Sequence, residues 1–356
     1  MTVRYAVVGA GWISQIAFMP GTHQASNSKL AAIVSGSPEN ARKLADFYQI
    51  EHVVSYDDYD ALLASDHIDA VYIALPNSMH ADFTIRALKA GKHALVEKPL
   101  ALDEAECKAM IEAADAAGVY LMTAYRLHNE PATVEVLEQI RAGSIGQPRF
   151  FSSLFSFQSG ADNHRLQAAH WGGPLQDIGV YCINAARHIF GTEPTEAIAM
   201  KNHGDDPRFA EVEEMIAGTL RFPCGGIAQF NASFGASDRN SYTVMGTEGE
   251  ITLEDAYDFQ TPARLILRRG DKVTARDFPQ TDHFAGQTAY FSDCIQAGTP
   301  PEPDGHEGLA DVRVLRAIEA ASLTGQAQPI ANAPRTAHPE PDMIREFPPT
   351  DHRLLV

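Results

Sequence analysis

The first 125 residues alternate short apolar runs with stretches whose apolar residues recur at helical spacing. The apolar runs predict six strands, at residues 4–8, 30–35, 52–54, 69–75, 93–96 and 119–124. The stretches between them predict helices, the first ending near Gln24 and the others at residues 38–48, 79–90 and 103–116. Strands that are apolar throughout are buried on both faces, as in a parallel sheet covered by helices on each side. We therefore expect a doubly wound parallel α/β domain over residues 1–125.

Beyond residue 126 the pattern changes to alternating apolar and polar positions. Helices are predicted at residues 131–142 and 174–190, and strands at 149–157, 195–202, 213–222, 226–234, 241–246, 250–254 and 263–268. Turn residues at 222–226 and 246–250 predict hairpin connections. Two more helices, at 284–297 and 307–324, come before a proline-rich segment from about residue 329, which we expect to be an extended arm. Residues 126–356 are thus predicted to form an α+β domain with a large, mostly antiparallel open sheet for substrate binding and oligomerisation.

Charge and composition exclude several classes of partner. The chain carries 46 acidic against 28 basic residues, a formal net charge of −18. Such a surface repels a polyphosphate backbone and anionic lipid, so we expect neither nucleic acid nor a membrane as partner. No apolar stretch approaches the roughly 18 residues of a membrane span, and residues 1–11 do not resemble a signal peptide. The four cysteines are scattered without a CxxC pair, which favours a reducing, cytoplasmic location without a metal site.

A glycine-rich turn follows the first predicted strand. Gly9 and Gly11 are spaced as in a dinucleotide-binding loop, and Ser14 takes the small third position. The first glycine permits a tight turn, the second lets a pyrophosphate approach the backbone, and the small third residue lets helix and strand pack closely. The helix that begins here offers N–H groups and partial positive charge to the phosphates. We therefore predict a Rossmann-type cofactor site that includes Gly9, Gly11, Trp12 and Ile13, in preference to a purely structural turn.

The end of the second predicted strand decides between the two nicotinamide cofactors. An NAD site has an acidic residue here that binds the ribose 2′-hydroxyl. The segment instead reads Ser35-Gly36-Ser37, which leaves room for a 2′-phosphate, and Arg42 and Lys43 follow. These two basic residues either neutralise that phosphate or form an ordinary solvated helix face. We predict NADP as the cofactor, with NAD less favoured, and contacts from both serines and both basic residues.

Two further motifs follow later strands, at the carboxyl edge where parallel sheets bind ligands. They read Leu75-Pro76-Asn77-Ser78-Met79-His80 and Glu97-Lys98-Pro99. Together with the glycine turn, and in this order along essentially the whole chain, they resemble the glucose–fructose oxidoreductase/inositol dehydrogenase (Gfo/Idh/MocA) family. The resemblance implies that Lys98 is catalytic and that a cis bond precedes Pro99. It also implies cofactor contacts from Leu75, Pro76, Asn77 and His80, which line the nicotinamide, and from Glu97 and Lys98.

The helix predicted at residues 174–190 carries the other half of the predicted active site. Its polar face holds Asp177, Tyr181, Asn184 and His188. Many members of the family carry Asp-x-Gly-x-His, whereas this chain has tyrosine in place of the histidine. It therefore resembles the tyrosine-type branch, which includes glucose–fructose oxidoreductase, dimeric dihydrodiol dehydrogenases and NADP-dependent xylose dehydrogenases.

Tyrosine can replace histidine as the acid/base group. Its pKa is ordinarily near 10, and an adjacent ammonium lowers it. Lys98 would supply that ammonium, so Tyr181 would take the alcohol proton as hydride leaves and return it in reduction. We expect Asp177 to bind a substrate hydroxyl or to orient Lys98.

Three side chains outside the motifs are further candidates for substrate contact. Arg126 follows the sixth predicted strand and is placed to hold a sugar hydroxyl. His164 and Trp171 precede the catalytic helix, and the indole of Trp171 either stacks on a sugar ring or packs in the core. No arginine-rich clamp for a carboxylate is visible in the sequence, so we expect a neutral substrate, an aldose such as glucose or xylose, or a polyol.

The sequence therefore predicts an NADP-dependent oxidoreductase acting on CH–OH groups, with oxidation of an aldose at C1, or the reverse, as the central hypothesis. A dihydrodiol dehydrogenase would need a flatter, more aromatic pocket. A catalytically silent nucleotide sensor would not need both Lys98 and Tyr181. The open sheet is expected to carry helices on one face only, and Phe151, Phe155 and Phe157, or residues alternating with them, would be costly to leave in water on the other. This predicts a homodimer or homotetramer assembled through that face.

Overall fold

The computed structural model describes residues 2–161, 163–335 and 337–356, and these form two compact units. The first unit contains residues 1–130, 281–309 and 343–356, and the second contains residues 131–280 and 310–342. This division differs from the single boundary expected near residue 125, because two later segments return to the first unit.

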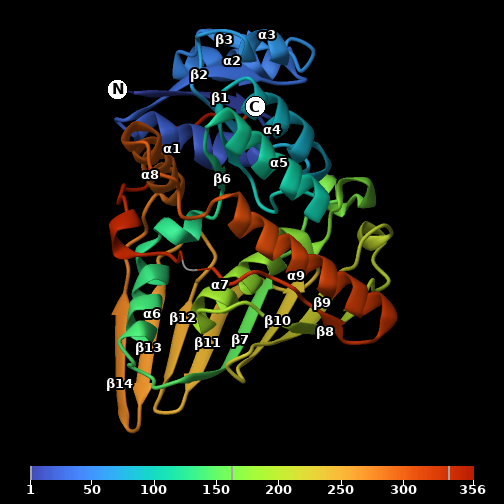
Figure 1. The fold of residues 1–356 in the computed structure, drawn as a ribbon, viewed down its shortest axis with the longest axis vertical. Coiled ribbons are helices and arrows are strands. Elements are labelled where there is room, and N and C mark those ends of the chain that lie inside the picture. The colour runs from blue at the N-terminus through green and yellow to red at the C-terminus, as the bar shows by residue number, and fades with distance from the viewer. Residues whose placement is uncertain (1, 162, 336) are drawn as a thin grey trace. The chain divides into compact units, whose positions relative to one another are not determined.

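The first unit is built on a six-stranded, wholly parallel sheet with the strand order β3-β2-β1-β4-β5-β6 (Figure 1). Its strands are β1 (Val3–Val8), β2 (Ser28–Val34), β3 (His52–Val54), β4 (Ala70–Ile73), β5 (His93–Val96) and β6 (Leu121–Thr123). Its helices are η1 (Ser14–Phe18), α1 (Met19–Gln24), α2 (Pro38–Tyr48), α3 (Tyr59–Leu63), η2 (Asn77–Met79), α4 (His80–Lys89), α5 (Glu104–Ala117), η3 (Arg126–Asn129) and α8 (His283–Ala297). Every position of β4 is buried, so helices cover both faces, as the continuous apolar runs predicted.

Local sequence explains where these helices begin and end. The carboxylate of Asp103 accepts a hydrogen bond from the Glu106 N–H and caps α5, which ends at Gly118 in the left-handed conformation. Asp282 caps α8 in the same way, through the N–H groups of the first turn. The return of α8 to this unit depends on Gly21 of α1, where a Cβ atom would lie 2.6 Å from the Ala285 backbone nitrogen. Only a residue without a side chain permits that close crossing.

The second unit is built on a nine-stranded sheet with the order β14-β13-β12-β11-β7-β10-β9-β8-β15. All pairs are antiparallel except β7 with β10. The strands are β7 (Pro148–Ser156), β8 (Glu196–Asn202), β9 (Met215–Arg221), β10 (Ile227–Ser233), β11 (Arg239–Gly246), β12 (Glu250–Glu254), β13 (Arg264–Arg269), β14 (Lys272–Asp277) and β15 (Gln328–Pro329).

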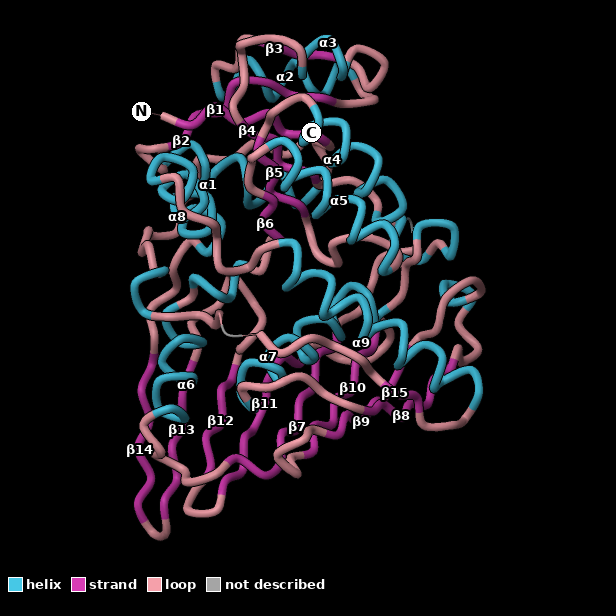
Figure 2. Tube along the Cα trace, viewed as in Figure 1, coloured by secondary structure: helices cyan, strands magenta, loops and turns pink. Residues whose placement is uncertain are grey.

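Helices of the second unit pack on the inner face of this sheet. α6 (Pro131–Arg141) lies against β12 and β13, and α7 (Val180–Phe190) lies against β7 and β10 (Figure 2). The remaining helical segments are η4 (His164–Leu166), η5 (Ala168–His170), η6 (Leu175–Gly179), η7 (Pro207–Phe209), α9 (Gly305–Thr324) and η8 (Pro341–Met343). The residues of α9 and of η8 are divided between the two units. In the described part of the chain, no helix has both the length and the apolarity to cross a membrane.

The register of β7 decides which of the two expected sets of side chains lies on the outer face of the sheet. Phe151 is fully buried, and Phe155 packs against Tyr257 on the helix-covered side, so these two rings do not form the outer face. The outer face of β7 carries the alternating residues, of which Leu154 is 37% exposed. Alternation in the sequence identified the two sets of side chains correctly, but it did not determine which set faces the helices.

Candidate active site

The turn after β1 has the geometry that a pyrophosphate requires. Gly9 has φ +94°, and a Cβ atom there would lie 2.4 Å from the Ala74 carbonyl oxygen, so no other residue fits. At Gly11 a Cβ would meet nothing within 4 Å, which leaves the backbone open to a ligand. The Ser14 hydroxyl donates a 2.6 Å hydrogen bond to the Gly9 carbonyl and holds the turn against η1. The residues present therefore fit a dinucleotide; Ile13 is partly buried, and the Trp12 side chain is 53% exposed beside the turn.

The end of β2 carries no acidic side chain. The buried hydroxyl of Ser35 accepts a 3.1 Å hydrogen bond from the N–H of Ser37, which directly precedes α2. Arg42 and Lys43 are exposed on α2, and Lys43 forms a 2.7 Å ion pair with Glu39 one turn earlier. The structure thus places both serines on the connection between β2 and α2, and both basic side chains on α2 itself.

The two motifs at the carboxyl edge are tied together by a histidine. His80 is buried, with Nδ1 2.9 Å from the Pro99 carbonyl oxygen and Nε2 2.9 Å from that of Leu75. Burial lowers the pKa of His80, and the two carbonyls oppose that effect. The peptide bond between Lys98 and Pro99 is cis, as the family resemblance implied. His80 therefore joins the turn that contains Pro76 and Asn77 to the loop that contains Lys98.

Glu97 places a carboxyl group directly beside Lys98 in the chain. The Tyr72 hydroxyl of β4 donates a 2.7 Å hydrogen bond to Glu97 Oε1. Removal from water raises the pKa of Glu97, while the positive charge of Lys98 and the hydrogen bond from Tyr72 act in the opposite direction. The edge of the sheet therefore holds a carboxyl group and an ammonium on consecutive residues.

Arg126 is more enclosed than the sequence suggested. It is 4% exposed, and its Nη1 lies 2.9 Å from Nδ1 of the buried His283 at the start of α8. Burial and the charge of Arg126 hold the pKa of His283 well below its usual value, so the imidazole is neutral and accepts this hydrogen bond. The Arg126 charge also favours the ionised form of Glu97.

In the second unit, η6 and α7 carry the predicted acid/base residues. Asp177 and Tyr181 are partly exposed, whereas Asn184 and His188, further along the same face, are buried. Asp177 Oδ2 lies 3.2 Å from the Nε atom of Arg165, an ion pair that the sequence did not predict. On the polar face of this helix, Asp177 and Tyr181 are therefore accessible, whereas Asn184 and His188 are enclosed and help to anchor the helix.

Tyr181 lies against an aromatic cluster on the inner face of the sheet. Its ring centroid is 5.8 Å from that of Phe155 and 6.0 Å from that of Tyr257. The Tyr257 hydroxyl lies 2.7 Å from the Ser153 hydroxyl, which fixes the ring that supports Tyr181. The phenol is thus carried on a rigid helix and backed by packed rings.

The anchor of α7 is a buried ionic network. Arg187 donates two hydrogen bonds to Glu193, at 2.8 and 2.7 Å, and a third, at 2.7 Å, to Asp311. Asn184 donates a 2.9 Å bond to the other oxygen of Asp311. Asp311 lies more than 120 residues after Arg187 and Asn184, so no local pattern in the sequence predicts these pairs.

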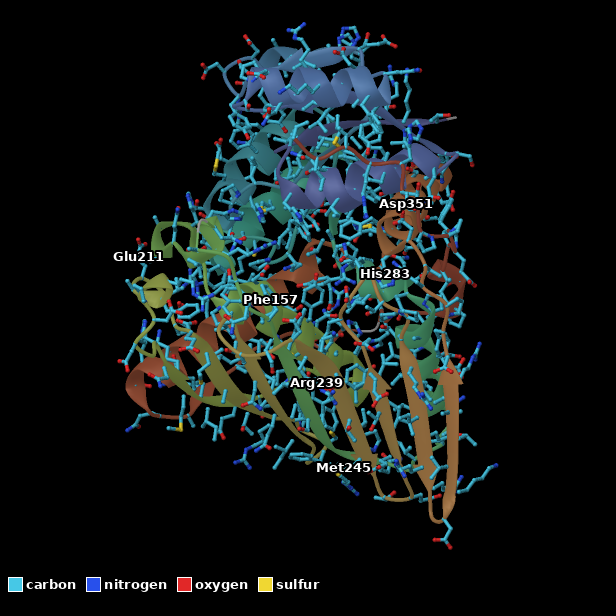
Figure 3. All side chains as sticks on the ribbon, turned by 180° about the vertical axis from the view of Figure 1, so that it is seen from behind. Phe157, Glu211, Arg239, Met245, His283 and Asp351 are labelled. Carbon is cyan, nitrogen blue, oxygen red and sulfur yellow. The ribbon has the colours of Figure 1, made fainter. Side chains whose placement is uncertain are left out.

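Trp171 and His164, the other two residues predicted to contact substrate, lie in different surroundings. Trp171 is 8% exposed, with the Arg316 guanidinium 4.0 Å from its ring centroid and its Nε1 3.2 Å from Glu319 Oε1, which is a packing environment. His164 instead borders a cavity of about 630 Å³, and burial lowers the pKa of its imidazole, assisted by the charge of Arg165. The cavity is lined by Ala161, Asn163, His164, Leu166, Gln167, Pro207, Arg208, Ala210 and Glu211, the last of which is labelled in Figure 3.

A parallel sheet with a pyrophosphate-binding turn, joined to a large antiparallel sheet, defines a two-domain, dinucleotide-dependent oxidoreductase. The chain belongs to the Gfo/Idh/MocA oxidoreductase family. The model of the family's NAD-binding Rossmann fold matches residues 3–125, and the model of the family's C-terminal domain matches residues 133–252.

Relatives of known activity share most of the chain. A D-xylose 1-dehydrogenase [NADP(+)] from Haloarcula marismortui is 32% identical over 331 residues, which is 90% of this chain and 91% of that protein. The solved aldose-aldose oxidoreductase from Caulobacter crescentus, in complex with glycerol, is 35% identical with a TM-score of 0.88, covering 93% of this chain and 100% of that one. A 3-ketoreductase from Actinomadura kijaniata, solved with NADP and TDP-benzene, is 27% identical with a TM-score of 0.82, covering 90% and 98%.

Proposed function

We propose that the protein is an NADP-dependent oxidoreductase that transfers hydride between the cofactor and a CH–OH group of a sugar or polyol. The observation that carries this proposal is the turn at Gly9–Gly11, open to a pyrophosphate and followed by a strand end without an acidic residue. The relatives support it, because an NADP-dependent xylose dehydrogenase and an aldose-aldose oxidoreductase match nearly the whole chain.

NADP fits the end of β2 better than NAD does. Ser35 and Ser37 offer hydroxyl and N–H groups without negative charge, and the exposed Arg42 and Lys43 supply positive charge on α2. We assign the contacts to the 2′-phosphate to these four residues. Gly9, Gly11, Trp12 and Ile13 hold the pyrophosphate, and Leu75, Pro76 and Asn77 line the nicotinamide.

Lys98 and Tyr181 carry the proton transfer in this proposal. The bound NADP accepts or supplies the hydride, and Tyr181 takes the hydroxyl proton in oxidation and returns it in reduction. Lys98 contributes positive charge that stabilises the substrate oxygen. Asp177, held by Arg165, orients a substrate hydroxyl. His80 and Glu97 position the loop that carries Lys98, since the His80 ring lies 2.9 Å from a carbonyl oxygen of each neighbouring loop and Glu97 is anchored by Tyr72.

The proposed substrate is a neutral aldose oxidised at C1, or the product of that reaction reduced. His164 borders a cavity whose lining includes Asn163 and Gln167, two residues with amide side chains of a kind suited to hydroxyls, and we assign His164 a contact with substrate. Arg126 and Trp171 are enclosed by other side chains, so we propose that they shape the surroundings of the substrate.

We also propose that the protein forms a homodimer or homotetramer through the outer face of the nine-stranded sheet. Seven residues that pair with one another across neighbouring strands form a row on that face, and none of them is charged. In strand order they are Ile198, Thr219, Gln229, Ser152, Thr243, Thr252 and Ile266. Exposed apolar side chains flank or belong to this row, namely Leu154, Ile198, Met200, Ile227 and Met245. Depletion of charge is the composition that distinguishes interface cores from other surface. We further propose that the protein is located in the cytoplasm, which the scattered cysteines favour.

The decisive experiment is a panel of aldoses and polyols with NADP and with NAD, read at the nicotinamide absorbance. We expect turnover with at least one neutral sugar and a higher kcat/KM with NADP. Binding of NADP, shown by a fluorescence titration, without turnover on any member of the panel would favour a nucleotide sensor instead.

A further inference from the structure

The segment at residues 343–356 lies along the helices of the first unit. It follows η8 (Pro341–Met343) and contains no further helix or strand. We call it the C-terminal arm; Asp351, labelled in Figure 3, belongs to it. The Asp282 N–H donates a 2.8 Å hydrogen bond to the Phe347 carbonyl, and the Gln24 amide donates to the Pro348 carbonyl at 3.3 Å. The arm is thus attached at the start of α8 and the end of α1.

Further along, the arm is held by aromatic contacts. The imidazole of His352 stacks on the rings of His23 and Phe47, with ring centroids 4.6 Å apart in both cases. The Tyr48 hydroxyl donates a 3.2 Å hydrogen bond to the His352 carbonyl. These contacts attach the arm to α1 and α2 at once.

The arm then reaches the residue that follows the glycine turn. The Val356 N–H donates a 2.8 Å hydrogen bond to Gln15 Oε1. The amide nitrogen of the same side chain donates a 2.7 Å bond to the Ala10 carbonyl, inside the turn. Gln15 is 6% exposed, whereas Val356 is 38% exposed, so both bonds are partly buried. One buried side chain therefore links the arm to the backbone of the turn.

Two side chains fix the carbonyls of this turn. Ser14 holds the Gly9 carbonyl and needs no contact with the arm, whereas Gln15 holds the Ala10 carbonyl and is itself oriented by Val356. A Cβ atom at Gly11 would meet nothing within 4 Å, so we infer that the peptide between Ala10 and Gly11 is oriented chiefly by the hydrogen bond from Gln15 to the Ala10 carbonyl. A rotation of this peptide would change where the following N–H groups point, and these are the groups that bind a pyrophosphate.

We propose that the C-terminal arm, acting through Gln15, is a positioning element of the cofactor site that orients the glycine turn for the pyrophosphate of NADP. It thereby sets the affinity for NADP and the rate at which NADP dissociates. This inference rests on the proposed function for the identity of the nucleotide. Gln15 is a positioning residue: it acts on the cofactor through the backbone of the turn.

The test compares deletion of residues 353–356, Gln15→Ala and the double variant, with Leu355→Ser as the matched control. Leu355 is on the same arm and 54% exposed. One hydrogen bond contributes about 0.5–1.5 kcal/mol, so the deletion should raise the Kd for NADP by roughly two- to thirteenfold, through faster dissociation. The KM for the sugar should not change, and kcat should not fall. The double variant should lose no more affinity than the stronger single variant, and Leu355→Ser should bind as the wild type does.

Hydrogen exchange of residues 9–15 in the nucleotide-free protein gives an independent readout. Exchange in the turn should be faster in the deletion and in Gln15→Ala, and unchanged in Leu355→Ser. His352→Ala, which retains the full chain, should reproduce part of the effect. A wild-type protein that does not bind NADP would overturn the proposed function and this inference with it. A wild-type protein that binds NADP, with variants equal to it in Kd and in exchange, would overturn the role of the arm alone.

Discussion

The hydroxyl of Tyr72 donates a 2.7 Å hydrogen bond to the carboxyl group of Glu97. This bond connects β4 to the loop that carries Lys98, and it offsets part of the rise that burial causes in the pKa of Glu97. Tyr72 is itself fully buried and stacks on Phe18, with ring centroids 3.6 Å apart, so the hydroxyl is held in place. The ionic state of Glu97 therefore depends on a residue that belongs to none of the sequence motifs.

Tyr72→Phe keeps the ring and removes this bond. One hydrogen bond contributes about 0.5–1.5 kcal/mol, so the free energy of unfolding should fall by an amount in that range. Without the bond the Glu97 carboxyl should titrate at a higher pH, and the acidic limb of the pH profile of kcat should move upward. Urea unfolding and the pH profile measure the two effects; a profile identical to that of the wild type would show that Glu97 has no influence on catalysis.

Tyr181→Phe tests the proposed acid/base group. The variant should lower kcat by roughly 10²–10⁴, the usual contribution of general acid–base catalysis, with little change in the Kd for NADP. Lys98→Met should be similarly severe, and the double variant should lose no more than the worse single variant, because each group acts through the same proton transfer. Stopped-flow measurement of hydride transfer separates this step from product release.

The control for Tyr181→Phe is Tyr257→Phe in the same aromatic cluster. Its hydroxyl is bonded to Ser153, so its removal should cost about 1 kcal/mol of stability and leave kcat within about twofold. If Tyr181→Phe kept near-normal turnover, the proton would come from another group, and His164 would be the next to replace.

The local sequence predicted most of the helices and strands that the structure contains. The helix predicted at residues 38–48 is α2 (Pro38–Tyr48), because proline at the first helical position and a serine before it mark the start. β14 (Lys272–Asp277) was missed because only Val273 and Ala275 in it are apolar, and all six of its residues are exposed, so no buried face imposes a stronger pattern. α3 (Tyr59–Leu63) was missed because five residues are too few to show a helical period.

The site was predictable only where a motif is local. The turn at Gly9 and the loop at Lys98 are short segments with their own backbone requirements, and both were located from sequence. The partners of these segments come from distant parts of the chain: Gln15 bonds to Val356, and Asp311 to Arg187. No periodicity or spacing predicts such pairs, because they depend on how the chain returns to each unit.

Ser35→Asp tests the choice of cofactor. A carboxylate at the end of β2 would repel the 2′-phosphate of NADP and accept hydrogen bonds from the ribose hydroxyls of NAD. The ratio of kcat/KM for NADP to that for NAD should fall by about tenfold or more, equivalent to at least about 1.4 kcal/mol. Lys43→Ala should weaken NADP without improving NAD. A preference of the wild type for NAD would contradict the proposal before any variant is made.

Leu154→Arg tests assembly through the outer face of the sheet. Leu154 lies on β7 in the middle of that face, opposite Ser241 and Asn231, and a buried unpaired charge there would be costly. Sedimentation velocity at micromolar concentration should show the wild type as a dimer or tetramer and the variant as a monomer. Leu323→Arg, on α9 and 69% exposed, is the control and should leave assembly unchanged. A monomeric wild type would contradict the proposal.

Stability should fall on mild acidification because of buried histidines in the first unit. His80 and His283 both have a lowered pKa in the folded protein, with burial as the largest cause. In the unfolded chain each titrates near 6.5, so below that pH the unfolded state binds more protons than the folded state. Their stabilising effect is therefore complete above about pH 6.5 and is lost as the pH falls from there toward the folded pKa. Each group contributes a slope of at most about 1.4 kcal/mol per pH unit.

His283→Gln isolates one of these groups. The glutamine oxygen can still accept a hydrogen bond from Arg126, but the side chain no longer titrates. Urea unfolding from pH 8 to pH 5.5 should show a constant difference in free energy between variant and wild type above about pH 7. Below pH 6.5 the wild type should lose stability faster, so the two curves converge. Curves that stay parallel over the whole range would mean that His283 takes up its proton equally in both states, which its contact with the Arg126 guanidinium opposes.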